Sequence, residues 1–144
     1  MIIKEVMSGH VQWIAPDIPV SEAARIMRDN EIGCIPVGEN DRLVGMITDR
    51  DITYRAVAAN EDLSGLTARD VMSKGMHFCF EDEGVDKAVQ VMQKNEIHHL
   101  TVLNRQKRMV GLVSLGDLAL KGDKSTRAGV VQLAARDAAR HQAA

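Results

Sequence analysis

Two pairs of side chains with matching chemistry occur in this sequence at the same spacing. Thr48 is followed three residues later by Asp51, and Ser114 is followed three residues later by Asp117. A hydroxyl and a carboxylate at this spacing can satisfy the free N–H groups at the start of a helix. A carboxylate in such a place can also accept hydrogen bonds from both hydroxyls of a ribose. Helix capping and nucleotide binding are therefore two interpretations of each pair.

Both pairs lie inside an internal repeat. Residues 43–52 recur as residues 109–118, with a glycine, the hydroxyl and the carboxylate in register. Upstream, Val6-Met7-Ser8 recurs as Val71-Met72-Ser73. Each copy is too short to bury a good core alone, so the two copies are expected to pack together.

The apolar residues predict the same order of elements in both copies. Helices are expected over the apolar stripes at residues 20–27 and 85–92. The expected strands are 11–14, 35–37 and 43–47 in the first copy, and 77–80, 100–102 and 109–113 in the second. A second helix is expected to open at Thr48 and at Ser114. Each copy is thus predicted to be an α/β (α+β) unit of the order β-α-β-β-α, with its helices on one face of a small sheet.

The chain divides into two repeats and a tail. The first repeat is expected over residues 1–61, the second over 62–122, and a C-terminal helical tail over 123–144, with the polar run 60–65 as the link. A helix that is marginal alone is expected in the tail, and it needs a partner surface on its own module or on a second subunit. Its predicted apolar stripe is Val130, Val131, Ala134, Ala135 and Ala138.

Composition narrows the class of protein. A net charge of −2 and 3% aromatic residues argue against a nucleic-acid binder. No stretch approaches the roughly 18 apolar residues of a membrane span, and the first residues do not have the pattern of a secretory signal. A cytoplasmic protein without membrane contact is expected. No G-x-S-x-G, H-E-x-x-H or P-loop motif accompanies the serines and histidines, so we expect no enzyme.

Sulfur and aromatic residues have simple structural interpretations. Cys34 and Cys79 are expected to be small buried apolar residues and not a redox pair. Trp13 and the equivalent Phe78 could stack on a base, but packing in the core is favoured. Met7 and Met72 are interpreted as residues that line the mouth of a cleft.

From about Ile3 to Leu120 the chain resembles a tandem pair of cystathionine β-synthase (CBS) domains, of the stand-alone bacterial type. The resemblance rests on the G-x-x-[ST]-x-x-D motif that occurs twice, on the Ile35-Pro36-Val37 strand and on the Val-Met-Ser segments. It implies two repeats packed about a pseudo-two-fold axis and a regulatory ligand instead of a catalytic cofactor. The implied ligands are the adenosine compounds AMP, ADP and ATP, with S-adenosylmethionine or an NAD-type ligand as alternatives.

The resemblance also implies which residues surround the ligand, in clefts between the two copies. The ribose would be held by Ser114 and Asp117 in one cleft and by Thr48 and Asp51 in the other. The base pocket of the first cleft would be lined by Gln12, Ile32, Gly33 and Leu112. That of the second cleft would be lined by Met46, His77, Ile97 and His98.

The two motifs are not equal in charge. Arg50 lies inside the first motif and Arg55 follows Asp51 by one helical turn, whereas Gly116 replaces the arginine in the second motif. The second motif is also expected to lack a cation that matches Arg55. The Thr48/Asp51 cleft is therefore predicted to tolerate more phosphates than the other.

His99 has two interpretations, as a phosphate contact implied by the resemblance or as a histidine that caps exposed strand backbone. A zinc site that joins it to Cys34 is disfavoured, because His98 and His99 point to opposite faces of a strand and a full ligand set is missing. No metal is expected.

Three functions compete at this point. A sensor module that binds an adenine nucleotide and signals occupancy through its packing is favoured. A ligand-free dimerisation scaffold is the second reading, and an enzyme is the third. Similar modules pair through their helices, so a homodimer is expected, and an unknown protein target is a further candidate partner.

Overall fold

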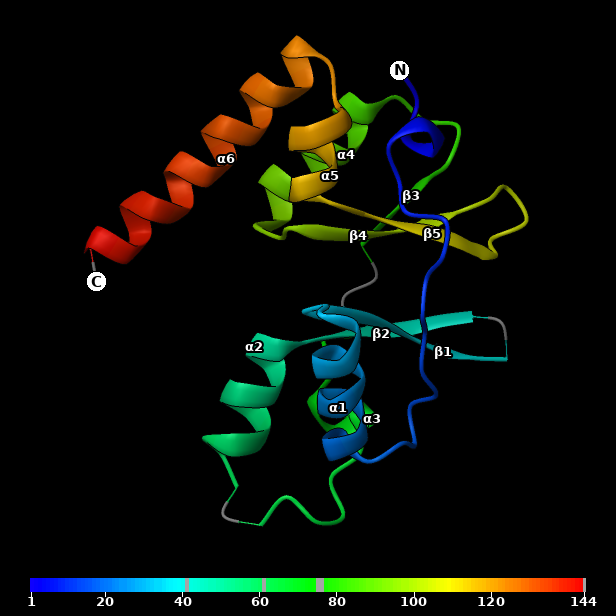
Figure 1. Ribbon diagram of the computed structural model, residues 1–144, viewed down its shortest axis with the longest axis vertical. Coiled ribbons are helices and arrows are strands. Elements are labelled where there is room, and N and C mark those ends of the chain that lie inside the picture. Colours follow the sequence, from blue (N-terminus) through cyan, green and yellow to red (C-terminus); the bar gives the residue numbers. More distant parts are fainter. Residues whose placement is uncertain (41, 61, 75–76, 144) are drawn as a thin grey trace. The chain divides into compact units, whose positions relative to one another are not determined.

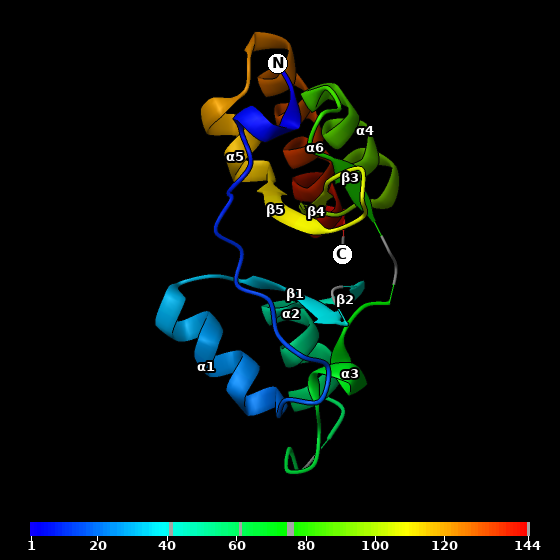
Figure 2. The same ribbon diagram turned by 90° about the vertical axis from the view of Figure 1, so that its right-hand side faces the viewer.

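The computed structural model describes residues 1–40, 42–60, 62–74 and 77–143. The chain forms two compact units. Unit 1 contains Met1–Val11 and His77–Ala144, and unit 2 contains Gln12–Met76. The blue N-terminal segment begins among the elements of unit 1 before the chain enters unit 2 (Figures 1 and 2). The opening segment of the first sequence repeat therefore belongs to the unit that is built around the second repeat.

Unit 1 contains a three-stranded sheet covered by helices on one face (Figure 1). Its elements are the 3-10 helix η1 (Ile3–Glu5), β3 (Phe78–Phe80), α4 (Val85–Asn95), β4 (His99–Leu103), β5 (Met109–Ser114), α5 (Leu115–Lys121) and α6 (Lys124–Ala143). Strand β4 lies in the middle, parallel to β3 and antiparallel to β5. The predicted order of strands and helices is confirmed for this copy.

Unit 2 has the same plan with a smaller sheet. Its elements are α1 (Val20–Asn30), β1 (Cys34–Glu39), β2 (Arg42–Thr48), α2 (Asp49–Asp51), the π-helix η2 (Ile52–Val57) and α3 (Ala68–Val71). Strands β1 and β2 are antiparallel. The strand expected at residues 11–14 is wrong, because that segment forms a single parallel bridge from Ile14 to Val37. Pro16, which has no N–H to donate, follows two residues later.

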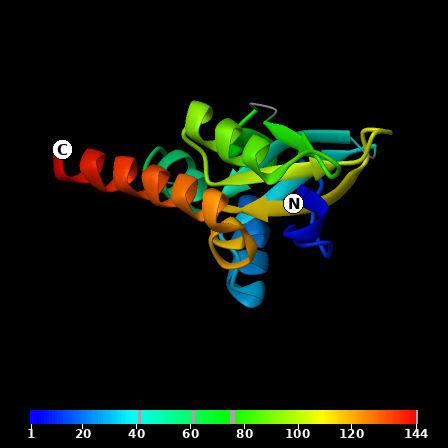
Figure 3. The same cartoon turned by 90° about the horizontal axis from the view of Figure 1, so that it is seen from above.

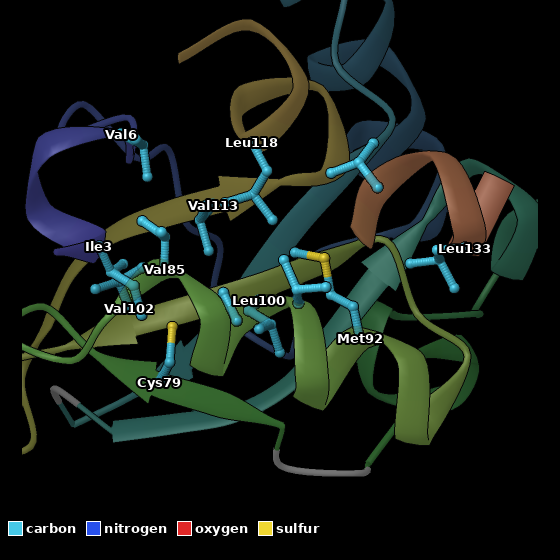
Figure 4. Close-up of a cluster of buried hydrophobic side chains, with 13 residues drawn as sticks. Ile3, Val6, Cys79, Val85, Met92, Leu100, Val102, Val113, Leu118 and Leu133 are labelled. Atoms are coloured by element: carbon cyan, nitrogen blue, oxygen red, sulfur yellow. The ribbon is translucent and has the colours of Figure 1, made fainter. Parts of the chain in front are cut away.

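The helix stripes form the two cores as predicted. Helix α1 buries Val20, Ala23 and Met27, and α4 buries its matching residues from Val85 to Met92. Figure 4 shows the core of unit 1, in which side chains of η1 and its neighbours pack with those of α4, β4, β5 and α5. The labelled residues are Ile3, Val6, Cys79, Val85, Met92, Leu100, Val102, Val113, Leu118 and Leu133. The N-terminal segment is thus part of the core of the second repeat.

The Val-Met-Ser segments complete the sheets across the repeat boundary. In unit 1, the backbone N–H of Ser8 donates to the carbonyl of Leu112 (2.9 Å), and the N–H of Leu112 donates to that of Ser8 (3.1 Å). In unit 2, Ser73 and Met46 exchange the same two hydrogen bonds, at 2.8 and 3.0 Å. Each segment therefore adds one paired residue to the strand that leads into a hydroxyl–carboxylate motif.

The motif glycines allow this close approach. A Cβ atom on Gly111 would lie 2.6 Å from Met7 Sδ and 2.9 Å from the carbonyl oxygen of Ser8. A Cβ atom on Gly45 would lie 2.5 Å from Met72 Sδ. Met72 is 5% exposed and belongs to the core of unit 2, so its predicted place at a cleft mouth is wrong. Met7 is partly buried against the core of unit 1.

The tail is a helix, but its buried face differs from the predicted one. Helix α6 begins at Lys124 and packs on α4 and α5. Figure 3 shows this helix from the side, in orange to red. It buries Val130 and Leu133, whereas Val131 is 66% exposed and the predicted alanines are exposed as well. The prediction omitted Leu133, the largest apolar side chain of the tail, and so placed the stripe too far around the helix. None of the helices in the described ranges is long and apolar enough to cross a membrane.

Replacement of Gly111 by alanine should destabilise the protein. The new methyl group meets a backbone oxygen as well as the methionine, so rotation of the Met7 side chain cannot relieve the clash, and a loss of about 1–3 kcal/mol in the free energy of unfolding is expected. Urea denaturation measures this loss. Gly9→Ala is the matched control, because no atom lies within 4 Å of the added Cβ. Equal stability of the two variants would contradict the packing argument.

Candidate ligand-binding site

The corner between β2 and α2 in unit 2 is closed by a capping box. The backbone N–H of Asp51 donates to Thr48 Oγ1, and that of Thr48 donates to Asp51 Oδ2, both at 3.0 Å. Thr48 ends the strand with extended backbone and is the N-cap of the helix. The capping interpretation is therefore confirmed for this pair. The Asp51 side chain keeps 12% of its surface exposed.

Two further groups hold the Asp51 carboxylate. The hydroxyl of Ser73 donates to Oδ1 at 3.3 Å, and Arg55 Nε lies 3.8 Å from the same oxygen. Arg55 also donates from a terminal nitrogen to the carbonyl of Met72 (3.2 Å). Arg55, expected at the phosphates, thus contacts both the carboxylate and the Val-Met-Ser segment.

The corner between β5 and α5 in unit 1 repeats this arrangement. The N–H of Asp117 donates to Ser114 Oγ (3.1 Å), and the N–H of Ser114 donates to Asp117 Oδ2 (2.9 Å). Lys121 Nζ lies 3.7 Å from Asp117 Oδ1 and donates to the carbonyl of Val6 at 3.3 Å. The Asp117 side chain is 18% exposed.

The expected lack of a second cation is wrong. Lys121 follows Asp117 by four residues, as Arg55 follows Asp51, and both cations bind the carboxylate and a backbone carbonyl of the exchanged segment. The remaining charge difference is Arg50, whose guanidinium lies 4.7 Å from the centre of the Tyr54 ring. A cation–π contact therefore holds Arg50 beside the first motif.

A third capping box shows what capping alone requires. The N–H and hydroxyl of Thr67 donate to Asp70 Oδ2 at 2.8 and 3.1 Å, before α3. Asp70 is exposed and follows no named strand. The motif carboxylates differ because each is partly buried at a strand-to-helix corner and pairs with a cation.

Each corner contacts a loop of its own unit, the loop before β1 in unit 2 and the loop before β4 in unit 1. The N–H of Asp49 donates to the carbonyl of Gly33 (3.0 Å), and the N–H of Leu115 donates to that of His98 (2.9 Å). A Cβ atom on Gly33 would lie 3.0 Å from Asp49 Oδ2. The backbone of Gly33 and of His98 thus lies at the motif of its own unit, whereas the prediction assigns each of these residues to the base pocket of the other motif.

The predicted site residues separate between the units. Unit 2 holds Gln12, Ile32, Gly33, Met46, Thr48, Arg50, Asp51 and Arg55. Unit 1 holds His77, Ile97, His98, His99, Leu112, Ser114 and Asp117. Each predicted cleft combines a motif of one unit with loop residues of the other, and this combination stays a prediction.

His99 begins β4 and lies opposite Ser114 in the β4–β5 ladder, as Cys34 lies opposite Thr48 in unit 2.

The two cysteines, Cys34 and Cys79, are both buried. Burial raises the pKa of the Cys34 thiol to about 12, with a further contribution from the nearby Asp51 and Asp49 carboxylates. Burial, aided by the negative charge of Glu83, raises the pKa of Cys79 to about 12 as well. Their interpretation as small buried residues is confirmed.

The aromatic residues are less buried than predicted. Trp13 is 49% exposed and its ring lies against Gly38, so its assignment to the core is wrong. Phe78 is half-buried and makes an edge contact with Phe80, with ring centroids 5.5 Å apart.

Comparison with known families identifies the module. The family model for the CBS domain matches twice, at residues 3–57 and 68–121. The chain belongs to the CBS domain family. The two matches contain one hydroxyl–carboxylate corner each, so the sequence resemblance is confirmed. The fold of a CBS pair with a C-terminal helix is confirmed as well.

Stand-alone CBS proteins are among its relatives. The chain is 34% identical over 131 residues to the CBS domain-containing protein YhcV of Bacillus subtilis. This alignment covers 88% of the present chain and 89% of YhcV. The CBS domain pair of protein MJ0100, solved in complex with 5′-methylthioadenosine and S-adenosyl-L-methionine, is 29% identical with a TM-score of 0.75, over 83% of this chain and 97% of that one.

A second similar structure carries metal. Hypoxic Response Protein I, solved with two coordinated zinc ions, is 28% identical with a TM-score of 0.74, over 83% of this chain and 97% of that one. Within the described ranges of the present chain, no three or more histidine, cysteine or acidic residues are grouped so that they could hold a metal ion.

Sequence reasoning missed two contributors to the corners. Ser73 is the serine of the second Val-Met-Ser segment, and Lys121 stands at the i+4 position after Asp117. The i,i+4 spacing of Lys121 from Asp117 could have predicted this ion pair from the sequence. The role of Ser73 had no local signal, because its partner Asp51 lies 22 positions earlier in the chain.

Loss of a capping hydroxyl should weaken unit 1. Ser114→Ala removes the acceptor for the Asp117 N–H, and the free energy of unfolding is expected to fall by about 1 kcal/mol, whereas Ser114→Thr keeps the acceptor. Urea denaturation of both variants measures the difference. Ser125→Ala, at an exposed position of α6, is the control. A Ser114→Ala variant as stable as this control would refute the contribution of the cap.

Proposed function

We propose that the chain is a non-catalytic regulatory module that binds adenosine-containing ligands at the Thr48/Asp51 and Ser114/Asp117 corners. The observation that carries this proposal is the similar CBS pair solved with two adenosine compounds, 5′-methylthioadenosine and S-adenosyl-L-methionine. The present chain has the same family match in both repeats and a hydroxyl–carboxylate pair in each. AMP, ADP and ATP are the ligands that we place first.

The hydrogen bonds of the caps leave room for a ribose. A carboxylate has about four acceptor positions on its two oxygens. In unit 1, the N–H and hydroxyl of Ser114 both bind Asp117 Oδ2, and Oδ1 faces Lys121 at 3.7 Å. Oδ1 can therefore accept from ribose hydroxyls without loss of the cap. Capping and ribose binding are compatible roles of one side chain.

The remaining contacts follow from the family resemblance. We propose that the base is held by residues from the loops before β1 and β4, around Gly33 and His98, and that Arg50 and His99 face the phosphates. Occupancy would then act by shifting the population of packing arrangements that a target recognises.

A cytoplasmic homodimer is part of the same proposal. Tyr54 and Val57 of η2 are 60% and 56% exposed, which leaves large apolar side chains on a helix of unit 2. Helix-to-helix pairing with a second copy would cover them. The ligand-free scaffold remains the rival function, because the capping boxes alone explain both hydroxyl–carboxylate pairs.

Thermal unfolding with a panel of AMP, ADP, ATP, 5′-methylthioadenosine, S-adenosylmethionine and NAD tests the function directly. A ligand at 100 times its Kd should stabilise the fold by about 2.7 kcal/mol. Asp51→Asn and Asp117→Asn should each lower the affinity of one site by at least about tenfold, because the amide replaces an ionised acceptor of ribose hydroxyls. Calorimetry measures both affinities.

Asp70→Asn is the matched control, since it alters a capping box that belongs to no motif. No stabilisation by any member of the panel would favour the scaffold. Equal effects of the Asp70 and Asp117 variants would assign the carboxylates to capping alone, and turnover of nucleotide would revive an enzymatic function.

Arg50 should make the unit 2 site sensitive to phosphates. With the other site removed by Asp117→Asn, Arg50→Gln is expected to weaken ATP about three- to tenfold, because one exposed charge contact is lost, and to leave 5′-methylthioadenosine unchanged. Calorimetric titration with the two ligands gives the comparison. Parallel losses for both would show that Arg50 does not contact phosphate.

A further inference from the structure

The C-terminal helix is fixed to unit 1 by its first half. Val130 and Leu133 are buried in the core of that unit. Gly129 lies against Val89, where a Cβ atom would approach to 2.7 Å, and the side-chain amide of Gln93 donates to the Gly129 carbonyl at 3.4 Å. These contacts of the first half determine the direction in which the second half of α6 continues.

The second half of α6 contacts the loop between α4 and β4. Asp137 hydrogen-bonds to His98 Nε2, and Arg140 pairs with Glu96. Glu96 ends α4 with a left-handed backbone, at φ 57°. The Arg140–Glu96 pair is more than half exposed and contributes little, whereas the Asp137 side chain is 25% exposed. With side chains 45% and 25% exposed, His98–Asp137 is the less exposed of the two contacts.

The same loop is bound to the candidate ligand site. The carbonyl of His98 accepts from the N–H of Leu115, the first residue of α5. Leu115 directly follows Ser114, and its turn carries Asp117. One residue, His98, thus binds the tail helix through its side chain and the motif through its backbone.

Unit 2 provides an internal comparison. The carbonyl of Gly33 accepts from Asp49 N–H just as His98 accepts from Leu115. Position 33, however, has no side chain that a further helix could bind, and in the described part of unit 2 the short helix α3 follows η2. The connection to a tail helix is therefore a property of the unit 1 corner.

We infer that Asp137 is a positioning residue for the ligand site of unit 1, acting through His98, so that α6 tunes the affinity of this site. The inference rests on the proposed function, since it concerns the same corner. The Asp137 carboxylate fixes the His98 ring, which keeps the loop carbonyl aligned with the first turn of α5.

AMP titration of full-length variants tests the inference, with Asp51→Asn as the background that leaves the unit 1 site. Asp137→Ala should weaken AMP about fivefold, and Asp137→Asn, which keeps an acceptor for the ring, should stay within about twofold of the parent. In a His98→Ala background, Asp137→Ala should have no further effect. Arg136→Ala, on an exposed position of α6, is the control.

Amide hydrogen exchange supplies a readout that needs no ligand. Asp137→Ala should speed exchange of the Leu115 amide about fivefold and leave the equivalent Asp49 amide unchanged. If the wild-type protein binds no member of the ligand panel, the proposed function fails, and the exchange rate of the Leu115 amide still decides the inference. Unchanged Leu115 exchange would overturn it. So would equal AMP affinities of the Asp137→Ala and Arg136→Ala variants, or an Asp137→Ala effect that persists without His98.

Discussion

The close contact between a methionine and the motif glycine is the constraint on which both corners depend. Met72 packs on Gly45 and Met7 packs on Gly111, with the following serine paired to the same strand. In both cases the Val-Met-Ser segment comes from the other sequence repeat. Neither sequence repeat can therefore complete its own corner. Each repeat needs the Val-Met-Ser segment of the other one to fold fully.

The exchanged segment also explains why each carboxylate has a cation. Arg55 and Lys121 bind a carboxylate and a carbonyl of the Val-Met-Ser segment at once. The cation keeps a partly buried charge compensated when no ligand is present, which lowers the cost of its burial. The corner is thus already organised by contacts within the protein, so the ribose binding proposed above would not have to form it.

Local features were predictable from the sequence. The stripe from Val20 to Met27, the capping boxes and the strands around Gly111 depend on neighbours within a few residues, which a sequence pattern records directly. The exchange of the Val-Met-Ser segments was not predictable. The two segments stand at equivalent positions of the two repeats, so the sequence is the same whether a segment packs on its own repeat or on the other one. Trp13 was misplaced for a related reason, since its burial depends on tertiary neighbours that a short apolar segment does not reveal.

The differences between the corners have a common logic. The shared parts, a hydroxyl, a carboxylate, a glycine and a cation, form the strand-to-helix corner itself. The unshared parts lie one contact further out: Arg50 on Tyr54 in unit 2, and His98 on Asp137 in unit 1. Substitution at such positions changes what surrounds a ligand without disturbing the cap or the methionine–glycine contact. If the two corners bind ribose as proposed, a duplicated module could in this way share one ribose chemistry between two sites whose outer contacts differ.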